Sequence, residues 1–395
     1  MNIKSLLLGS AAALVAVSGA RAADAVVIAE PEPMEYVRIC DTYGAGFYYI
    51  PGTETCLKFS GYMRYDVGIG NRGLLDVYDK EEWTVDEGDD DYNDTYFKRA
   101  RFQLRVDARQ ETELGTLRAY AAINFNYDTT TNGYVYDYVT YPGYAFTTSE
   151  NLMVMEHAYL ELGGFRAGVT DSYFSTFTGY SSGVMNDGIV PYGPFQTHQL
   201  SYTFTGGNGF TAGIALETGK GGAIDYYGTG QYTYDIYAID SYMPHVVGGV
   251  GYTAGWGGVS GVVGYDSVWE VWSAKGRVDL NVGDALTLFV MGGWADKDDY
   301  YYGSPSTLYQ PNYYAQWGGD WAVWGGGAWK FNEKATFNFE IGYDDAENFS
   351  AVANVAYELV PGFTVTPEVI YTDNFDTDPD DNWGGYFRLQ YNWGS

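Results

Sequence analysis

Basic residues, histidine and cysteine are scarce in this chain of 395 residues. It has 21 lysines and arginines against 51 aspartates and glutamates, with three histidines and two cysteines. A net charge of −30 excludes a general nucleic-acid binder, whose surface must be basic. The three histidines, His157, His198 and His245, lie in separate segments, and no G-x-S-x-G sequence accompanies them. We therefore predict that the protein is not an enzyme and needs no cofactor.

Long apolar runs are also absent once the first 22 residues are set aside. Lys4, the apolar run 6–17 and the small-residue site at Ala20 and Ala22 predict a signal peptide over residues 1–22. A short membrane anchor is the alternative, but the run is too short to span a bilayer. No other segment offers the ~18 apolar residues of a transmembrane helix. A membrane-spanning mature chain would therefore have to be a closed β-barrel, which also satisfies every backbone hydrogen bond.

The chain has only two cysteines, Cys40 and Cys56, and we expect it to be exported. This predicts a disulfide that closes a loop of about 15 residues and contributes about 3 kcal/mol. A metal pair is the alternative, but two thiols without nearby histidines make a poor zinc site. The acidic run 76–94 lacks the glycine and terminal glutamate of a calcium loop, so we predict no metal site there. We predict an N-terminal extension over 23–56 that contains the disulfide-closed loop.

The most informative pattern that is present lies in residues 99–109. Its polar positions alternate strictly with apolar ones, and a period of two predicts a β-strand. The polar face is Arg99, Arg101, Gln103, Arg105, Asp107 and Arg109. Four arginines cannot lie against a protein core without a large desolvation cost. This face must meet water, and the opposite face must meet an apolar environment.

Similar alternation recurs in 57–69, 117–127, 337–344 and 387–393. Strands that are apolar on one side and polar on the other are typical of a transmembrane β-barrel around a wet lumen. A soluble sandwich also alternates, but its polar face rarely lines up so many arginines. The 40 tyrosines and 11 tryptophans suit the interfaces of a membrane.

Short turns alternate with longer connections along residues 57–395. Seven turns are expected, at 111–116, 163–164, 206–209, 255–258, 282–285, 332–335 and 360–363. Eight connections are expected, near 70–97, 128–150, 171–198, 219–242, 266–270, 295–317, 344–348 and 373–382. Together they predict an all-β, antiparallel transmembrane barrel of 16 strands over 57–395, wide enough for an aqueous channel. Short turns would face the periplasm and long loops the outside.

Eight segments spread along the chain form a distinctive set, namely 36–57, 61–67, 111–116, 176–180, 202–210, 242–249, 316–325 and 359–363. Together they closely resemble the trimeric general porins of alphaproteobacteria. The resemblance implies a homotrimer in the bacterial outer membrane, among lipids and lipopolysaccharide. It also implies passive diffusion of ions and small hydrophilic solutes through a water-filled channel.

In that family the third long loop folds into the barrel and narrows the pore, facing basic residues on the wall. Transferred to this chain, the loop is 171–198 and its acids are Asp171 and Asp187. The wall residues are Arg64, Arg101 and Arg105, which the alternation also places on the inner face.

Two other functions stay open at this point. A substrate-specific channel, for instance for oligosaccharides, could use the inward residues Tyr62 and Tyr120 as an aromatic track. A secreted lectin-like β protein is the other. For a general pore, the arginine row favours anions locally. Without Lys4 and Arg21, however, 19 basic residues face 51 acidic ones, and this net charge of −32 favours cations at the mouth. Because acids dominate the long loops, we expect a preference for cations.

Overall fold

The computed structural model describes residues 38–70, 77–78, 92–93, 96–135, 144–226, 231–298, 300–302, 307–375 and 382–394. The predicted signal peptide 1–22 and most of the acidic run 76–94 lie outside these residues. All of the described residues except Arg38 belong to one compact unit, Ile39–Ser395. None of the helices within the described ranges is long and apolar enough to cross a bilayer.

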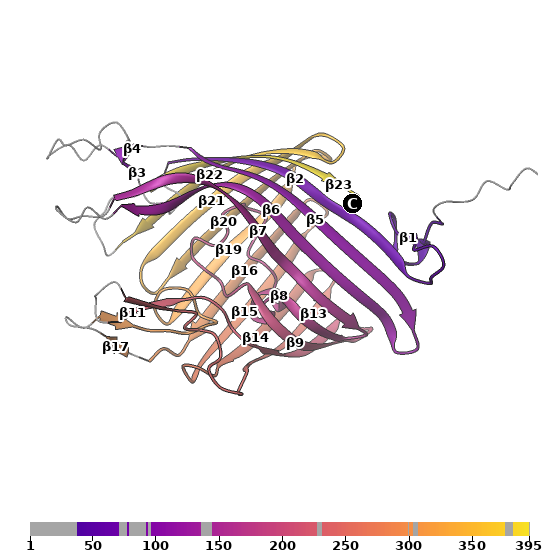
Figure 1. Cartoon of the computed structure of the whole chain (residues 1–395), viewed down its shortest axis with the longest axis horizontal. Helices are drawn as coiled ribbons and strands as arrows, with labels where there is room; N and C mark the ends of the chain where they lie inside the picture. Colours follow the sequence, from indigo (N-terminus) through magenta and orange to yellow (C-terminus); the bar gives the residue numbers. More distant parts are fainter. Residues whose placement is uncertain are drawn as a thin grey trace, which may run out of the picture. The chain divides into compact units, whose positions relative to one another are not determined.

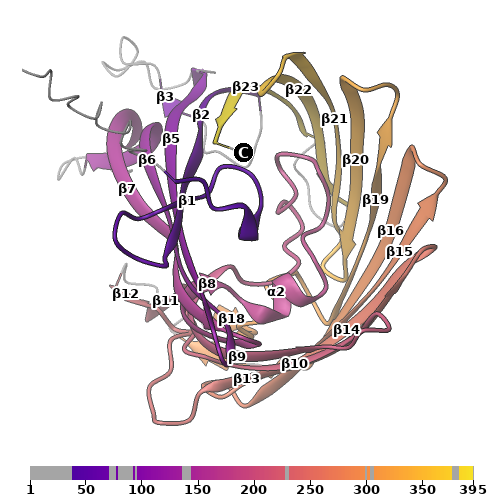
Figure 2. The same cartoon turned by 90° about the vertical axis from the view of Figure 1, so that its right-hand side faces the viewer.

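Sixteen antiparallel strands form a closed ring in this unit (Figures 1 and 2). They are β2 (Cys56–Gly70), β5 (Phe97–Thr112), β6 (Gly115–Val135), β7 (Tyr144–Leu162), β8 (Phe165–Asp171), β9 (Gln196–Thr205), β10 (Phe210–Glu217), β13 (His245–Ala254), β14 (Gly257–Asp266), β15 (Val271–Val282), β16 (Leu286–Ala295), β19 (Trp321–Lys330), β20 (Ala335–Asp344), β21 (Asn348–Val360), β22 (Phe363–Asn374) and β23 (Asn382–Trp393). Each strand pairs with the next in this order, and β23 pairs with β2. The predicted barrel of 16 strands is confirmed. Closure gives every strand of the ring a partner on both sides.

The remaining elements are short. The strand β1 (Tyr48–Tyr49) adds to the start of β2, and η2 (Asp41–Tyr43) is a single helical turn before it. Three small hairpins lie within connections that were predicted as loops. They are β3 (Val77–Tyr78) with β4 (Tyr92–Asn93), β11 (Ala223–Tyr226) with β12 (Gln231–Tyr234), and β17 (Tyr300–Tyr302) with β18 (Thr307–Tyr309). The helix α2 (Tyr173–Phe177) follows β8.

All seven predicted turns join consecutive strands, but one predicted long connection is wrong in extent. The expected loop 128–150 is mostly strand, because pairing of β6 with β7 continues from Asp128 opposite Glu150 to Val135 opposite Tyr144. The threonines at 129–131 are β-branched and favour an extended backbone. Their polar side chains end the apolar alternation, so the pattern stops before the strand does.

The two faces of the ring differ sharply in exposure. On β2, Met63 and Ile69 are 46% and 51% exposed, whereas Tyr62 and Asp66 are 5% and 0% exposed. The exposed apolar side chains form the outer face that a barrel turns to lipid. The polar side chains share the opposite face. The predicted assignment of the two faces of β2 is confirmed.

The segment 172–195, which connects β8 to β9, packs against the polar face. Its helix α2 contacts β13 and β14 (Figure 2). Phe174, Val190 and Tyr192 of this segment join Met291 and Trp324 of the barrel wall in the largest buried apolar cluster. The core of this protein therefore lies between the segment and the wall. The predicted infolding of the segment to narrow a pore stays a prediction.

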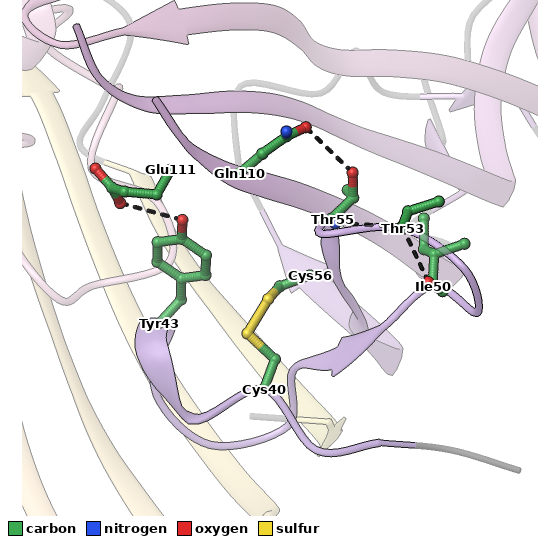
Figure 3. Close-up of a disulfide and its surroundings, with 8 residues drawn as sticks. All are labelled: Cys40, Tyr43, Ile50, Thr53, Thr55, Cys56, Gln110 and Glu111. Carbon is green, nitrogen blue, oxygen red and sulfur yellow. Dashed lines mark hydrogen bonds between the residues drawn. A yellow bond between two sulfur atoms is a disulfide. The ribbon is translucent and has the colours of Figure 1, made fainter. Parts of the chain in front are cut away.

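The predicted disulfide between Cys40 and Cys56 is present (Figure 3). It ties the segment before β2 to the first residue of that strand. The Tyr43 hydroxyl donates to Glu111 Oε2 at 3.2 Å, beside the first short turn. Lys58 Nζ donates to Ala45 O at 3.0 Å. The first barrel strand, β2, begins at Cys56. The division of the chain into an extension that ends at residue 56 and a barrel that begins at residue 57 stays a prediction.

Candidate pore constriction

The three predicted wall arginines lie together on the polar face of β2 and β5. Arg64 is opposite Arg101 in the antiparallel register, and Ser60 is opposite Arg105. Arg101 Nε donates to Asn126 Oδ1 at 2.7 Å, and Arg105 Nε donates to Gln103 Oε1 at 2.5 Å. These acceptors are neutral amides, so they hold the guanidinium groups in place without neutralising their charges.

Arg64 is held in a similar way. It donates to the Tyr62 hydroxyl, and its closest carboxylate oxygen, on Asp66, is 3.9 Å away. Asp66 is itself engaged by Arg388 at 2.8 Å. The negative charge of Asp66 is therefore paired mainly with Arg388 and neutralises Arg64 only in part.

Other arginines of the polar face form close ion pairs. The pairs are Arg99 with Asp128, Arg109 and Arg118 with Asp107, Arg118 and Arg166 with Glu161, Arg277 with Asp279, and Arg388 with Asp66, at 2.6 to 2.9 Å. Within the described residues, Arg101 and Arg105 have no carboxylate oxygen within 4.0 Å. Their charges are therefore available to water and solutes at this place in the barrel.

The aromatic rings beside these arginines are covered. The Arg64 and Arg105 guanidinium carbons lie 4.5 and 5.6 Å from the Tyr62 ring centroid. Arg118 lies 4.6 Å from the Tyr120 ring centroid. Cations over the ring faces leave little aromatic surface for a sugar, which speaks against a stacking track at these two tyrosines.

The predicted loop acids belong to the segment 172–195 and to the residue that precedes it. Asp171 ends β8 and accepts from the Tyr180 hydroxyl at 2.6 Å. Asp187 accepts from the Tyr192 hydroxyl at 2.8 Å. Burial raises the pKa of Asp187 above that of an ordinary carboxyl, and the bond from Tyr192 offsets part of this. Across the described ranges, no ion pair joins either acid to the three arginines.

The helix α2 of this segment packs across the ring from these arginines, whereas residues 183–186 are held on β21 and β22. In the pairing order, β13 and β14 are seven and eight strands away from β2, so α2 packs about halfway round the ring. The bonds that hold the segment come from wall side chains. Glu368 accepts from Met185 N and Asn186 N at 2.5 and 3.1 Å.

Further wall anchors hold the segment on several strands. They are Lys275 Nζ to Tyr192 O at 2.7 Å, Arg277 Nη1 to Tyr180 O at 2.5 Å, Trp324 Nε1 to Val190 O at 2.8 Å, Asn354 Nδ2 to Gly183 O at 3.2 Å, and Ser172 Oγ to Glu217 Oε2 at 2.8 Å. The polar ends of the buried Lys275 and Glu217 side chains are hydrogen-bonded in this way, which offsets part of the cost of removing them from water.

The sequence did not predict any of these anchors. Glu368 lies on the inner face of β22, but the buried Ile370 on the same face interrupts the polar pattern there. Lys275 points inward on β15, where the inward positions alternate between apolar, polar and charged residues and so give no clear pattern. The usable signal was its place two residues from Arg277, on the same face of β15.

A closed 16-stranded barrel with an apolar exterior and a charged inner face defines a transmembrane channel protein. The family profile described as "Porin subfamily" matches residues 24–391, and the chain belongs to that family. It is similar to Porin Omp2b of Brucella neotomae, with 50% identity over 398 residues that cover 99% of each chain. Porin Omp2b of Brucella abortus (strain 2308) matches with the same identity and coverage.

Solved structures share the fold. The outer membrane channel DcaP of Acinetobacter baumannii matches with a TM-score of 0.60 and 16% identity, over 87% of this chain and 99% of that chain. The Salmonella typhi OmpF complex with daunomycin matches with a TM-score of 0.51 and 9% identity, over 86% and 98%. The protein is therefore a bacterial outer-membrane porin, a channel and not an enzyme.

Proposed function

We propose that this porin lets ions and small hydrophilic solutes cross the outer membrane by passive diffusion through one constriction. Arg64, Arg101 and Arg105 form one side of it. The segment 172–195, with Asp171 and Asp187, forms the other side. The observation that carries the proposal is that Arg101 and Arg105 hold unpaired charges on a face where the other arginines named above are ion-paired.

The mechanism follows from charge and hydration. Positive charges on one wall and carboxylates on the other orient water across the passage. An apolar solute must displace this ordered water without replacing its hydrogen bonds, so it is disfavoured. An ion or a polar solute keeps its hydration or exchanges it for the charged walls. The size of the opening then sets the largest solute that passes.

Ion preference depends on which charges dominate. The wall arginines attract anions locally, whereas the acidic long loops concentrate cations at the mouth. With 51 acidic residues in the chain, we propose a net preference for cations. Reversal potentials in a salt gradient across a planar bilayer measure it. A clear anion preference would mean that the arginine wall outweighs the loops.

We also propose a homotrimer embedded among lipids and lipopolysaccharide, with the short turns in the periplasm. The support is the resemblance to trimeric general porins and the broad apolar outer face. Single-channel recording tests it together with the pore. Three closing steps of equal size per insertion are expected, and single isolated steps would contradict the trimer without contradicting the channel.

A further inference from the structure

A cavity of about 460 Å³ lies beside the end of α2 on the inner face of the barrel. Its lining comes from α2 and the residues just after it, from β9, β10, β13 and β14 near their short turns, and from Arg166 of β8 and Asp279 of β15. Among the lining residues are Phe177, Thr178, Thr203, Thr211, Gly251 and Ser260. A volume of this size falls within the range of small-molecule sites. It is separate from the arginine wall on β2 and β5.

Hydroxyl groups dominate the polar part of this lining. The most informative is Thr178, which is 3% exposed and whose Oγ1 has no hydrogen-bond partner in the described part of the chain. A buried hydroxyl without a partner is costly, and a bound molecule that supplies one removes the cost. Hydroxyls both donate and accept, so they match a ligand that presents the same groups.

Charged residues at the cavity are already neutralised. Arg166 pairs with Glu161 at 2.6 Å, and Asp279 pairs with Arg277 at 2.8 Å. An ionic ligand would find no unpaired countercharge on either residue. The lining therefore favours a neutral ligand over an anion or a cation.

Phe177 supplies an apolar surface beside the hydroxyls. The ring is half-buried and packs so close to β13 that a Cβ at Gly249 would lie 2.6 Å from its Cδ1. An aromatic ring fixed by its surroundings, next to hydroxyl groups, suits a sugar, which has C–H faces and hydroxyl edges. We propose that this cavity is a binding site for a neutral mono- or disaccharide. The inference rests on the proposed function in one respect, since the lumen must admit the sugar.

The test measures binding directly, with D-glucose and sucrose as probes and the full-length porin in detergent micelles. Saturation-transfer NMR and calorimetric titration report binding whether or not the sugar blocks current. Gluconate, a charged molecule of similar size, is the comparison ligand. Conductance in potassium chloride is recorded from the same preparation. A preparation that conducts but shows no saturable sugar binding defeats this inference alone, and one that does not conduct defeats the proposed function.

Two variants locate the site. Thr178→Val keeps the shape and removes the hydroxyl, and should weaken binding about fivefold, as expected for one hydrogen bond. Gly251→Val should abolish binding, because its side chain would enter the cavity. A Cβ at Gly251 has no neighbour closer than 3.5 Å, so the backbone tolerates it. Ser260→Ala is a further variant if either of these fails to fold.

Matched controls carry the same chemical changes elsewhere. Thr366→Val removes a buried hydroxyl on β22, outside the cavity lining. Gly261→Val adds the same side chain at a glycine of β14 where a Cβ has no neighbour closer than 3.8 Å. Both should bind sugar as the unmodified porin does. Absence of saturable binding, gluconate binding as tight as glucose, or binding unchanged in Thr178→Val and Gly251→Val would each overturn the proposal.

Discussion

Arg64 of β2 and Arg101 of β5 lie directly opposite each other, so two guanidinium groups leave the same face of neighbouring strands. Like charges in opposite positions destabilise a β-ladder. Asp66 does not compensate fully, because Arg388 binds it at 2.8 Å while Arg64 is 3.9 Å away. The two arginines therefore lower the stability of the barrel and keep part of their charge unpaired. We expect such a cost where the charges act on solutes that pass through the channel.

Removing one of these charges should change ion selectivity. A unit charge about 5 Å from a permeating ion in water contributes about 0.8 kcal/mol. Because the charge acts on cations and anions with opposite sign, Arg101→Ala should raise the cation-to-anion permeability ratio by about fivefold to fifteenfold, depending on salt, and should raise the single-channel conductance. Reversal potentials and conductance in a planar bilayer measure both. Lys98→Ala is the matched control, because Lys98 is exposed on the outer face of the same strand. Equal effects of the two variants would remove Arg101 from the constriction.

Acidification should act on ion selectivity through Asp187 at a higher pH than through an ordinary carboxyl. Its pKa is raised by burial, so it takes up a proton at a higher pH than ordinary carboxyls do. The preference for cations should fall in an early step as the pH drops from 7, and Asp187→Asn should lack this step. Because the folded pKa lies above the unfolded one, Asp187 lowers stability at neutral pH, and this cost disappears on acidification. Reversal potentials measured against pH check the first point. Identical profiles for the two proteins would contradict it.

Glu368 should be the anchor whose loss frees the segment 172–195 most. It accepts three hydrogen bonds from Met185 and Asn186, from the two backbone N–H groups and the Asn186 side-chain amide. Hydrogen bonds to charged groups contribute about 2 kcal/mol each. Glu368→Ala should therefore increase open-channel noise and enlarge the limit on solute size in liposome-swelling assays. Glu333→Ala, on the exposed turn between β19 and β20, removes the same charge without touching the segment. A quiet channel of unchanged size limit in Glu368→Ala would show that the other anchors suffice.

The disulfide should stabilise only the segment that precedes the barrel. Cys40→Ser with Cys56→Ser removes a constraint of about 3 kcal/mol on a loop of this length. The ring closes by pairing of β23 with β2 and does not need β1, so the barrel should stay folded. Limited proteolysis should cut within residues 41–55 of the variant, while heat-modified mobility on gels stays that of a folded barrel. Reductant should reproduce the cleavage in the unmodified porin and add nothing in the variant. Loss of the folded barrel would show that the segment is part of its folding unit.

Local alternation was enough to predict the barrel. In 99–109 each side chain is assigned to a face by its own position, because a strand has a period of two and lipid accepts only apolar groups. The same rule placed Arg64, Arg101 and Arg105 on one face. The turns were predictable because short loops between antiparallel strands need particular residues. The lengths of the strands were harder to predict. In β6 and β7 the pairing continues through polar threonines, where the apolar alternation has already ended.

Which charges stay unpaired was decided only when the ring closed. Arg388 reaches Asp66 across 322 positions of sequence, and Glu368 reaches Asn186 across 182. Alternation predicts the face of each side chain but not its neighbour on a strand that is distant in sequence. Pairing depends on register and closure, which are properties of the whole barrel. The chain's own pattern therefore specified a membrane barrel with a charged interior, and the tertiary structure selected the arginines that remain free to act on solutes.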